Sequence, residues 1–245
     1  MSDSVWSPIV EFRQYTLHPR TRDILVELFD REFIETQEAL GMKVIGQFRP
    51  LDDPDRFIWL RGYPDMATRA RALEAFYDGP VWAQHRDVAN ATMIDSDNVL
   101  LLRPAGPGRG FVLDRERPPP GSTRVPDGLV VATIYYLEPS GADQFTDFFD
   151  SALVPVLKSA GASILAAFVT EPAPNDFPSL PVREGERVLV YFTAFADESA
   201  YERHQATLVD TQRWQQLQRE LSRHLTSDAE IWRLRATARS QCTAV

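Results

Sequence analysis

Cysteine is almost absent from the sequence, and long hydrophobic runs and an excess of basic charge are absent too. Cys242 is the one cysteine, which excludes a disulfide framework and a thiolate metal cluster. No apolar run approaches the roughly 18 residues of a spanning helix, and the first residues lack the basic and apolar regions of a secretory signal. Acidic residues outnumber basic ones by 35 to 26, which disfavours nucleic-acid binding. We therefore expect a cytoplasmic protein with no membrane span.

The sequence does contain an internal repeat. An offset of 120 residues superimposes a first group of positions, and an offset of 132 superimposes a second group. The first group aligns Tyr15 with Tyr135, Phe29 with Phe149, Gly41 with Gly161 and Phe48 with Phe168; the second aligns Trp59 with Tyr191, Trp82 with Trp214 and Arg103 with Arg235. The second copy therefore carries a net insertion of 12 residues. It falls in the proline-rich stretch 171–186, which we predict to be a loop between two strands.

Each copy shows the pattern β-α-β-β-α-β. In the first copy, we predict strands over 9–17, 42–49, 56–63 and 98–103, with a helix after Pro19 and a helix capped by Asp65 that continues as a second piece over 81–92. This order is that of a ferredoxin-like unit. The predicted fold class is α+β: two tandem ferredoxin-like (βαββαβ) repeats whose sheets pack together as an α+β barrel.

The predicted boundaries follow from composition. Residues 1–103 form the N-terminal repeat and 128–235 the C-terminal repeat. Between them, 104–127 contains six prolines and four glycines, which predicts a linker without helix or central strand. Residues 236–245 lack periodicity, so we expect a flexible tail.

The two copies differ in polarity at equivalent positions. The first copy has polar residues where the second has apolar or small ones: Glu11, Arg13, Gln47, Arg61, His85 and Asn90 correspond to Val131, Thr133, Ala167, Thr193, Leu217 and Ser222. Polar groups kept on one side only are candidates for a functional site.

Two strands of the first copy carry most of these residues. Glu11, Arg13 and Tyr15 share one face of a strand, and Trp59 and Arg61 share a face of another. A cluster of one glutamate and two arginines inside a barrel requires either mutual salt bridges or a bound anionic or hydroxylated ligand. Both alternatives, an ion-pair network at the barrel seam and a ligand site, remain open at this point.

Several segments of the first copy resemble the NIPSNAP family, which belongs to the dimeric α+β barrel superfamily. They are Glu11-Phe-Arg-Gln-Tyr15, Gly41-Met-Lys-Val-Ile-Gly-Gln-Phe48, Asp55-Arg-Phe-Ile-Trp-Leu-Arg61, and Phe76-Tyr-Asp-Gly-Pro-Val-Trp82 leading to Asn98-Val-Leu-Leu-Leu-Arg103. The resemblance spans roughly 9–103. It implies the barrel fold; relatives in the superfamily include cofactor-independent quinol monooxygenases and haem enzymes, and superfamily habit favours a homodimer. A reaction borrowed from fold alone is an associational argument.

From these residues we derive one enzymatic hypothesis. His85, three residues after Trp82 on a helix, is the predicted general base, and the alternative is a capping or surface histidine. Arg13 and Arg61 would stabilise the anion of a phenol-like substrate, while Tyr15 and Trp59 would stack on its ring. Glu11, Gln47 and Asn90 complete the predicted substrate-binding set. The predicted reaction is a cofactor-independent monooxygenation or a related one, on an aromatic or apolar, quinol-like ligand.

Two alternatives accompany this hypothesis. The histidines lack metal-ligand spacing, so we predict no metal and no cofactor; His204 and His224 are the conceivable axial ligands of a haem, but their neighbours on the helix suit solvent better. The rival function is non-catalytic: a ligand-binding or protein-interaction (scaffold) module.

Overall fold

The structure, a computed structural model, describes residues 7–139 and 142–244, without the side chains of residues 142 and 143. The first half contains β1 (Ile9–Leu17), α1 (Arg22–Leu28), η1 (Phe29–Phe33), α2 (Ile34–Ala39), β2 (Lys43–Pro50), β3 (Arg56–Tyr63), α3 (Met66–Tyr77), α4 (Pro80–Asn90), β4 (Met93–Asp95) and β5 (Val99–Pro104). The second half contains β6 (Leu129–Tyr136), α5 (Ala142–Phe148), η2 (Phe149–Leu153), α6 (Val154–Ser159), β7 (Ser163–Thr170), β8 (Val188–Phe195), α7 (Glu198–Val209), α8 (Gln212–Leu221) and β9 (Glu230–Ala236).

Eight of these strands close into an antiparallel barrel. Their order around it is β3-β2-β9-β6-β8-β7-β5-β1, and the pairing of β1 with β3 closes the ring, while β4 lies outside it beside β1. The last strand of each half pairs with the second strand of the other half, β5 with β7 and β9 with β2. The α+β barrel expected from the sequence is therefore present, and its two halves share one sheet.

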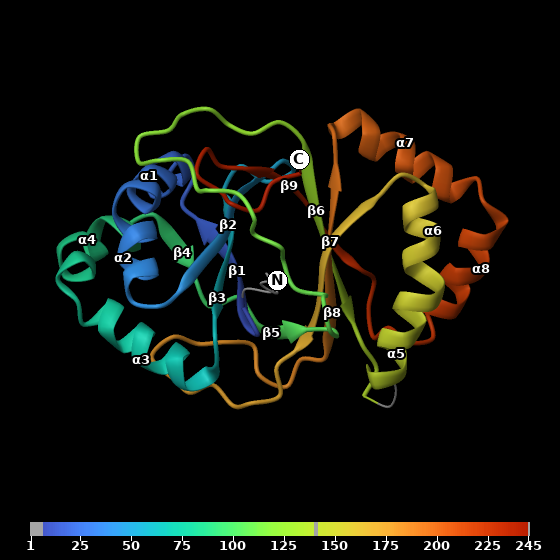
Figure 1. Ribbon diagram of the computed structural model, residues 1–245, viewed down its shortest axis with the longest axis horizontal. Coiled ribbons are helices and arrows are strands. Elements are labelled where there is room, and N and C mark those ends of the chain that lie inside the picture. Colours follow the sequence, from blue (N-terminus) through green and yellow to red (C-terminus); the bar gives the residue numbers. More distant parts are fainter. Residues whose placement is uncertain (1–6, 140–141, 245) are drawn as a thin grey trace.

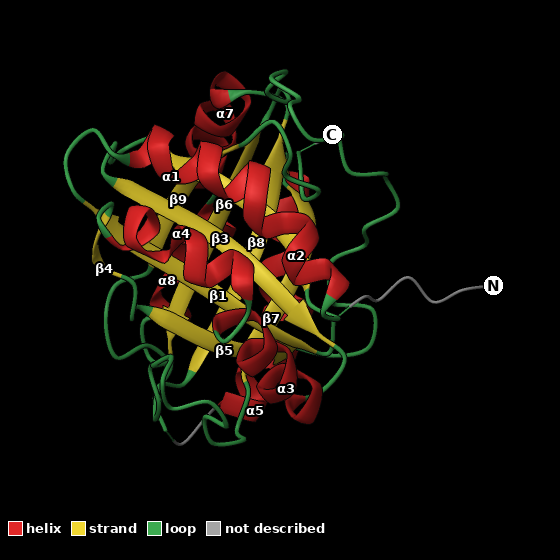
Figure 2. Cartoon of the chain, turned by 90° about the vertical axis from the view of Figure 1, so that its left-hand side faces the viewer, coloured by secondary structure: helices red, strands yellow, loops and turns green. Residues whose placement is uncertain are grey.

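The barrel lies between two layers of helices (Figure 1). Helices α1 to α4 cover the outer face of the strands on one side, and α5 to α8 cover the other side. Figure 2 looks onto the first layer and shows α1 and α2 laid across the barrel strands. Among the described residues, no helix is long and apolar enough to cross a membrane.

The barrel interior is mainly apolar, with the buried Gln14 of β1 as a polar exception that accepts a hydrogen bond from Trp232 Nε1 at 3.0 Å. Val10 and Phe12 of β1 point into it together with Phe168 and Phe192, and Phe12 meets Phe192 edge to face with ring centroids 5.4 Å apart. The alternate residues of the same strands point outward under the helices, because side chains alternate between the two faces of a strand. Both faces of these strands are thus covered, which explains their nearly continuous apolar character.

The helices begin and bend as their sequences require. The carboxylate of Asp65 accepts the backbone N–H of Thr68 at 2.6 Å, which confirms the predicted cap of α3, and Asp197 caps α7 through Ala200 at the same distance. A π-helical turn interrupts the first helix of each half, at η1 and η2. These turns are 120 residues apart, as are β2 and β7, whereas β3 and β8, and α3 and α7, are 132 apart.

The linker and the C-terminal tail are built into the fold. Phe111 of the linker fills the barrel interior, with its ring centroid 5.0 Å from that of Phe192. The tail differs from the flexible segment expected from the sequence: Arg239, Ser240 and Cys242 are buried, and the backbone N–H of Cys242 donates to Ile45 O at 2.8 Å. The tail is held mainly by polar contacts and not by an apolar stripe. For this reason its sequence lacks hydrophobic periodicity.

The insertion in the second half is the loop 171–187 between β7 and β8, as predicted. In Figure 1 it runs, gold to orange, from the barrel toward α3 of the first half. Its residue Phe177 stacks on Tyr77 at the end of α3, with ring centroids 6.1 Å apart. Leu180 and Val182 pack on the same apolar layer. The loop therefore covers part of the N-terminal half.

Candidate functional site

The predicted site residues of β1 and β3 lie on one face, but it is the outer face of the barrel. Glu11 is paired with Arg61, and Arg13 with Trp59, across the β1–β3 ladder. All four side chains lie beneath the first helix layer and are buried. The expectation that the glutamate and arginines stand inside the barrel is therefore wrong. The interior takes the opposite, apolar set of residues.

Glu11 is the centre of a buried cluster of charges. Its Oε2 atom accepts hydrogen bonds from Arg13 Nη1 at 2.8 Å and from Arg61 Nη2 and Nε at 2.6 and 3.0 Å. Its Oε1 atom accepts from Nε of a third arginine, Arg69 on α3, at 2.8 Å. All four side chains have an exposed fraction of 0%. We call Glu11, Arg13, Arg61 and Arg69 the arginine cluster.

The remaining donors of the arginine cluster are partly used. Arg13 Nε donates to the Tyr15 hydroxyl at 2.9 Å, and Arg61 Nη1 donates to Gln37 Oε1 at 3.0 Å. Gln37 in turn donates to Phe33 O at 3.0 Å. Such secondary contacts fix the orientation of each guanidinium.

The long loop of the other half completes the cluster. Arg69 Nη1 donates to Asn175 Oδ1 at 3.0 Å and forms an ion pair with the carboxylate of Asp176. The side chain of Asp176 remains 26% exposed, unlike the other members. The cluster's ion pairs thus join three guanidiniums to two carboxylates, one of which belongs to an exposed loop.

Burial and mutual attraction set the ionisation of the cluster. Burial alone would raise the pKa of Glu11, but the guanidiniums, Arg61 foremost, hold it well below its ordinary value. Burial would likewise lower the pKa of Arg13, but Tyr15 and Glu11 keep it above its ordinary value. Burial raises the pKa values of Tyr15 and Tyr63. At neutral pH, the Glu11 carboxylate and the guanidiniums of Arg13 and Arg61 are therefore charged, and both phenols are neutral.

Three buried donors around the cluster have no hydrogen-bond partner among the described residues. They are Trp59 Nε1, the Tyr63 hydroxyl and Arg69 Nη2. An unsatisfied buried donor costs free energy unless water or a ligand occupies it. These three donors and the excess positive charge both favour binding of an anionic oxygen.

Aromatic rings surround the cluster. The guanidinium carbons of Arg61 and Arg13 lie 5.0 and 5.6 Å from the centroid of Trp59. The Trp59 ring also contacts Phe29 and Tyr15, with centroids 4.7 and 6.0 Å apart. Cation–π contacts of this kind stabilise buried guanidiniums. They give the region both apolar walls and cationic groups.

The other predicted residues lie apart from the cluster. His85 is on α4, with Nε2 3.7 Å from the Glu32 carboxylate and its ring 6.4 Å from that of Phe33. Asn90 is exposed at the end of α4. Gln47 is buried beside Trp59 in the β2–β3 ladder, but its Nε2 donates to Asp30 Oδ1 at 3.4 Å. The structure thus joins Glu11, Arg13, Tyr15, Trp59 and Arg61, and the contacts of His85 are with η1.

Sequence reasoning missed Asp30. It lies on η1, and burial raises its pKa to about 6 despite the opposing effect of Arg239. A carboxyl that titrates near neutral pH suits a general base. Asp30 recurs as Asp150 in the repeat, but recurrence alone gave no sign of its burial. Gln47, its partner, is the residue through which it adjoins the predicted site.

Sequence reasoning also missed Arg69, Gln37, Tyr63 and Asp176. A polarity difference between the copies could have found Arg69 and Gln37, because their counterparts at offsets of 132 and 120 are Tyr201 and Leu157. Asp176 has no counterpart, since it lies in the insertion. Its contact with Arg69 spans 107 residues and leaves no local pattern.

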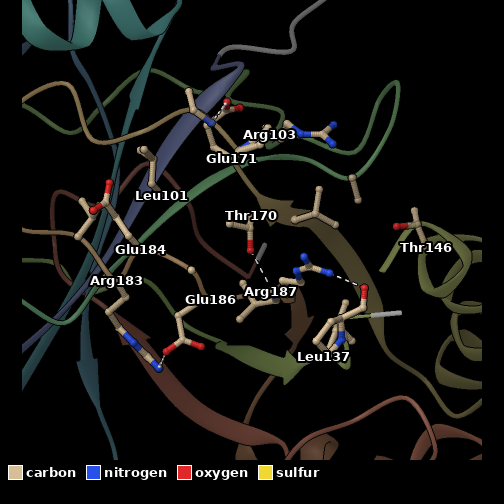
Figure 3. A pocket seen from close by; sticks show the side chains of 18 of the residues that line it. Leu101, Arg103, Leu137, Thr146, Thr170, Glu171, Arg183, Glu184, Glu186 and Arg187 are labelled. Atoms are coloured by element: carbon tan, nitrogen blue, oxygen red, sulfur yellow. Dashed lines mark hydrogen bonds and ion pairs between the residues drawn. The ribbon is translucent and has the colours of Figure 1, made fainter. Parts of the chain in front are cut away.

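Two cavities lie elsewhere, and neither is lined by the arginine cluster. The larger, of about 860 Å³, is a groove beneath the loop 171–187, lined by both polar and apolar residues (Figure 3). Its charged groups largely pair with protein atoms: Arg183 with Glu186 at 2.6 Å, and Arg187 with Pro139 O. The second, of about 690 Å³, lies in the C-terminal half. Among the described residues, no group of three or more histidine, cysteine, aspartate or glutamate side chains could hold a metal ion.

Comparison with solved structures defines the class of fold. Over most of its length, the chain is similar to an anthrone oxidase-like protein, with 13% identity, 97% and 96% of the two chains covered and a TM-score of 0.57. It is also similar to a proposed monooxygenase from Lactobacillus acidophilus, with 14% identity, 94% of each chain covered and a TM-score of 0.55. A proposed monooxygenase from Fusobacterium nucleatum is similar as well, with 8% identity, 94% and 93% of the two chains covered and a TM-score of 0.56. At these identities the likeness concerns the fold alone. The protein thus has the α+β barrel fold of these monooxygenase-like proteins.

The sequence comparison identifies the family of the N-terminal half. Residues 10–107 match the NIPSNAP family model. This part of the chain is a NIPSNAP domain, as its sequence segments indicated. No curated protein matches the sequence.

Proposed function

We propose that the N-terminal half binds a small aromatic or otherwise apolar molecule that carries an ionisable oxygen, with the arginine cluster as the binding site. The observation that carries the proposal is that three buried guanidiniums share one buried carboxylate, Glu11, while their second carboxylate, Asp176, belongs to a partly exposed loop. A phenolate or enolate in place of Asp176 would supply that second negative charge. Its oxygen would also accept hydrogen bonds from donors that lack a partner among the described residues.

We infer that the Asp176 carboxylate and that anion compete for one position beside Arg69. The side chain of Asp176 is 26% exposed, whereas that of Glu11 is fully buried, and it sits on a loop that covers the site from the other half. An anionic ligand that displaces Asp176 would take over its ion pair with Arg69. Tyr15 and Trp59 would flank the ring of the ligand, and Glu11 would keep the arginines oriented.

The reaction we propose is oxygenation without a cofactor. For a substrate of the anthrone type, the arginines stabilise the anion left when a base removes a proton. The methylene carbon then loses its second hydrogen and receives one oxygen atom of O2, while the other oxygen atom leaves as water. The candidate bases are His85 and Asp30. Asp30 accepts a hydrogen bond from Gln47, which stands opposite Trp59 in the β2–β3 ladder, whereas His85 lies 3.7 Å from the Glu32 carboxylate.

A non-catalytic function is the second candidate, and the packing of the cluster favours it. Glu11 already accepts hydrogen bonds from all three arginines, and neither of the two cavities includes them. In this case, the cluster is a structural ion-pair network, and the protein is a ligand-binding or interaction module.

Binding of 4-nitrophenolate, measured by isothermal titration calorimetry, separates a ligand site at the arginine cluster from a structural ion-pair network. If Asp176 competes with the ligand, Asp176→Asn should tighten binding at least threefold. Arg13→Ala and Arg61→Ala should weaken binding more than they lower stability. The control is Asp78→Asn, at an exposed residue that follows α3. Lower melting temperatures in the arginine variants, with no binding to the wild-type protein, would contradict a ligand site.

Oxygen uptake with anthrone tests the reaction itself. The wild-type protein should consume oxygen, and the variant that lacks the true base, His85→Ala or Asp30→Asn, should lose that activity. Turnover that survives both changes would contradict both assignments. Native mass spectrometry of the purified protein adds a direct test, because a retained haem would overturn the cofactor-free reaction. The same spectrum reports whether two copies form the proposed homodimer.

We also propose that the two halves are fused copies of one ferredoxin-like unit. The support is the recurrence of element bounds at the offsets of 120 and 132 residues. The bulge in β2 between Val44 and Gly46 recurs in β7 between Ile164 and Ala166. Divergence of the copies would then have left the charged cluster in one half only.

A further inference from the structure

The cavity of about 690 Å³ lies between the outer face of the barrel and the helices of the C-terminal half. Its floor is formed by β6 and β8, where Thr133, Tyr135, Tyr191 and Thr193 are all buried. Its other walls come from α7 and α8 and the segment before β9, with Ile231 half-exposed at the rim. The volume is in the range of ordinary small-molecule sites, roughly 300 to 1,000 Å³.

This cavity is the counterpart of the arginine cluster. At the offsets of the repeat, Glu11 and Arg13 become Val131 and Thr133, Arg61 becomes Thr193 and Arg69 becomes Tyr201, and all four counterparts line the cavity. The strand registers agree, because β6 pairs Val131 with Thr193 as β1 pairs Glu11 with Arg61. Where the first half is filled by long charged side chains, the second half is open.

The groups around the cavity are almost all uncharged. Asp228 is the one charged residue among the lining residues, and it lies exposed at the rim. Burial raises the pKa values of Tyr135 and Tyr191 and lowers that of His204, so all three are neutral near pH 7. A charged ligand would lose its hydration without gaining a partner.

Hydrogen-bonding groups are nevertheless present. The hydroxyls of Tyr135 and Tyr191 lie 3.4 Å apart and retain capacity for a further partner. Nδ1 of His204 lies 3.0 Å from Ala160 O, to which a neutral ring donates from this nitrogen, leaving Nε2 as an acceptor. Aromatic walls, from Phe195, Tyr201 and Trp214, complete the lining.

We propose that this cavity is a second ligand site, for an uncharged aromatic molecule that bears a hydroxyl group. The ring lies against the aromatic walls, and the hydroxyl reaches the tyrosine pair on the sheet. The site is separate from the arginine cluster and selects the opposite charge state of its ligand. The protein would therefore hold the neutral and anionic forms of related molecules in its two halves.

Calorimetric titration with 2-naphthol tests the proposal. The wild-type protein should bind one equivalent at this site, and Thr193→Phe, which fills the cavity from its floor, should weaken that binding at least tenfold. The matched control is Thr207→Phe, at an exposed position of α7 outside the lining. 2-Naphthoate has the same rings but carries a charge. Its binding at this site, defined as the binding that Thr193→Phe removes, should be at least tenfold weaker than that of 2-naphthol.

A second variant covers the case in which Thr193→Phe fails to fold. Tyr135→Phe removes one hydroxyl and leaves the cavity shape, so it should weaken binding of 2-naphthol severalfold while binding of naphthalene stays unchanged. Asp176→Asn should leave 2-naphthol binding as it is, which separates this site from the arginine cluster. Binding of 2-naphthol that is absent, or indifferent to both cavity variants, would overturn the proposal.

Discussion

Glu11 and Arg61 stand directly opposite each other on β1 and β3, and two nitrogens of the Arg61 guanidinium donate to a single oxygen of the Glu11 carboxylate, at 3.0 and 2.6 Å. The second oxygen of Glu11 serves Arg69 on α3. One carboxylate thus links two strands to the helix layer above them.

This arrangement predicts that removing Glu11 alone lowers the free energy of unfolding more than removing Glu11 together with Arg13 and Arg61. Glu11→Val should destabilise the fold by about 3–5 kcal/mol, because it leaves buried guanidiniums without a counter-charge. Adding Arg13→Thr and Arg61→Thr, which copies the residues of the other half, should recover about half of that loss. Urea unfolding of the single and triple variants measures both values. Costs that simply add would contradict a coupled network.

Asp30 predicts a specific pH dependence. Its folded-state pKa of about 6 exceeds the ordinary aspartate value of 3.8. Between these pH values the folded state holds more protons than the unfolded state, so the free energy of unfolding contributed by Asp30 falls as pH rises through this window. The full loss is at most about 2–3 kcal/mol, from about 1.4 kcal/mol per unit of pKa.

The comparison with Asp30→Asn isolates this effect. The wild-type protein should lose stability relative to the variant as pH rises from about 4 to 7. Chemical unfolding of both proteins across this range gives the difference directly. A constant difference would show that Asp30 ionises as an ordinary exposed aspartate does.

The sequence predicted the positions of the strands along the chain better than it predicted which side chains face the barrel interior. Strand ranges such as 9–17 and 56–63 agree with β1 and β3, because alternating apolar residues and turns are local signals. Period-two spacing placed Glu11 and Arg13 on one face, but it did not state which face is inside. The apolar alternate set, Val10 and Phe12, contained that information, since the interior of an eight-stranded barrel is just wide enough for side chains to fill.

The remaining features of the site depend on contacts between distant segments. Asp176 reaches Arg69 from an insertion in the other half, and Arg239 reaches the helix of Glu35 from the tail. No periodicity or motif marks such a pair, because each partner is an ordinary polar residue in its own segment. His85 was singled out by its type and its position on a helix, but its contacts are with Glu32 and Phe33 on η1 and not with the arginine cluster.

The linker should contribute to the barrel core through Phe111. Its side chain is buried among Phe168 and Phe192, so Phe111→Ala should cost about 3–5 kcal/mol through the cavity it leaves. Val112, the next residue, is exposed, and Val112→Ala should cost less than about 0.5 kcal/mol. Thermal or urea unfolding compares the two. Equal small effects would mean that the linker is dispensable to the core.

The C-terminal tail should be a structural part of the N-terminal half. Arg239 is 1% exposed, forms an ion pair with Glu35 and donates to Pro118 O at 3.0 Å and to Asp30 O. Arg239→Ala removes a buried guanidinium and its hydrogen bonds to these partly exposed acceptors, and should cost about 1–3 kcal/mol. Arg235→Ala is the matched control, because its pair with Glu198 is about half-exposed and should contribute about 0–1 kcal/mol.

Cys242 gives a second readout, since burial raises its pKa to about 12 and its thiol should resist alkylation until the tail detaches. Iodoacetamide labelling should therefore be faster in Arg239→Ala than in Arg235→Ala, and equal rates would show that Arg239 does not hold the tail.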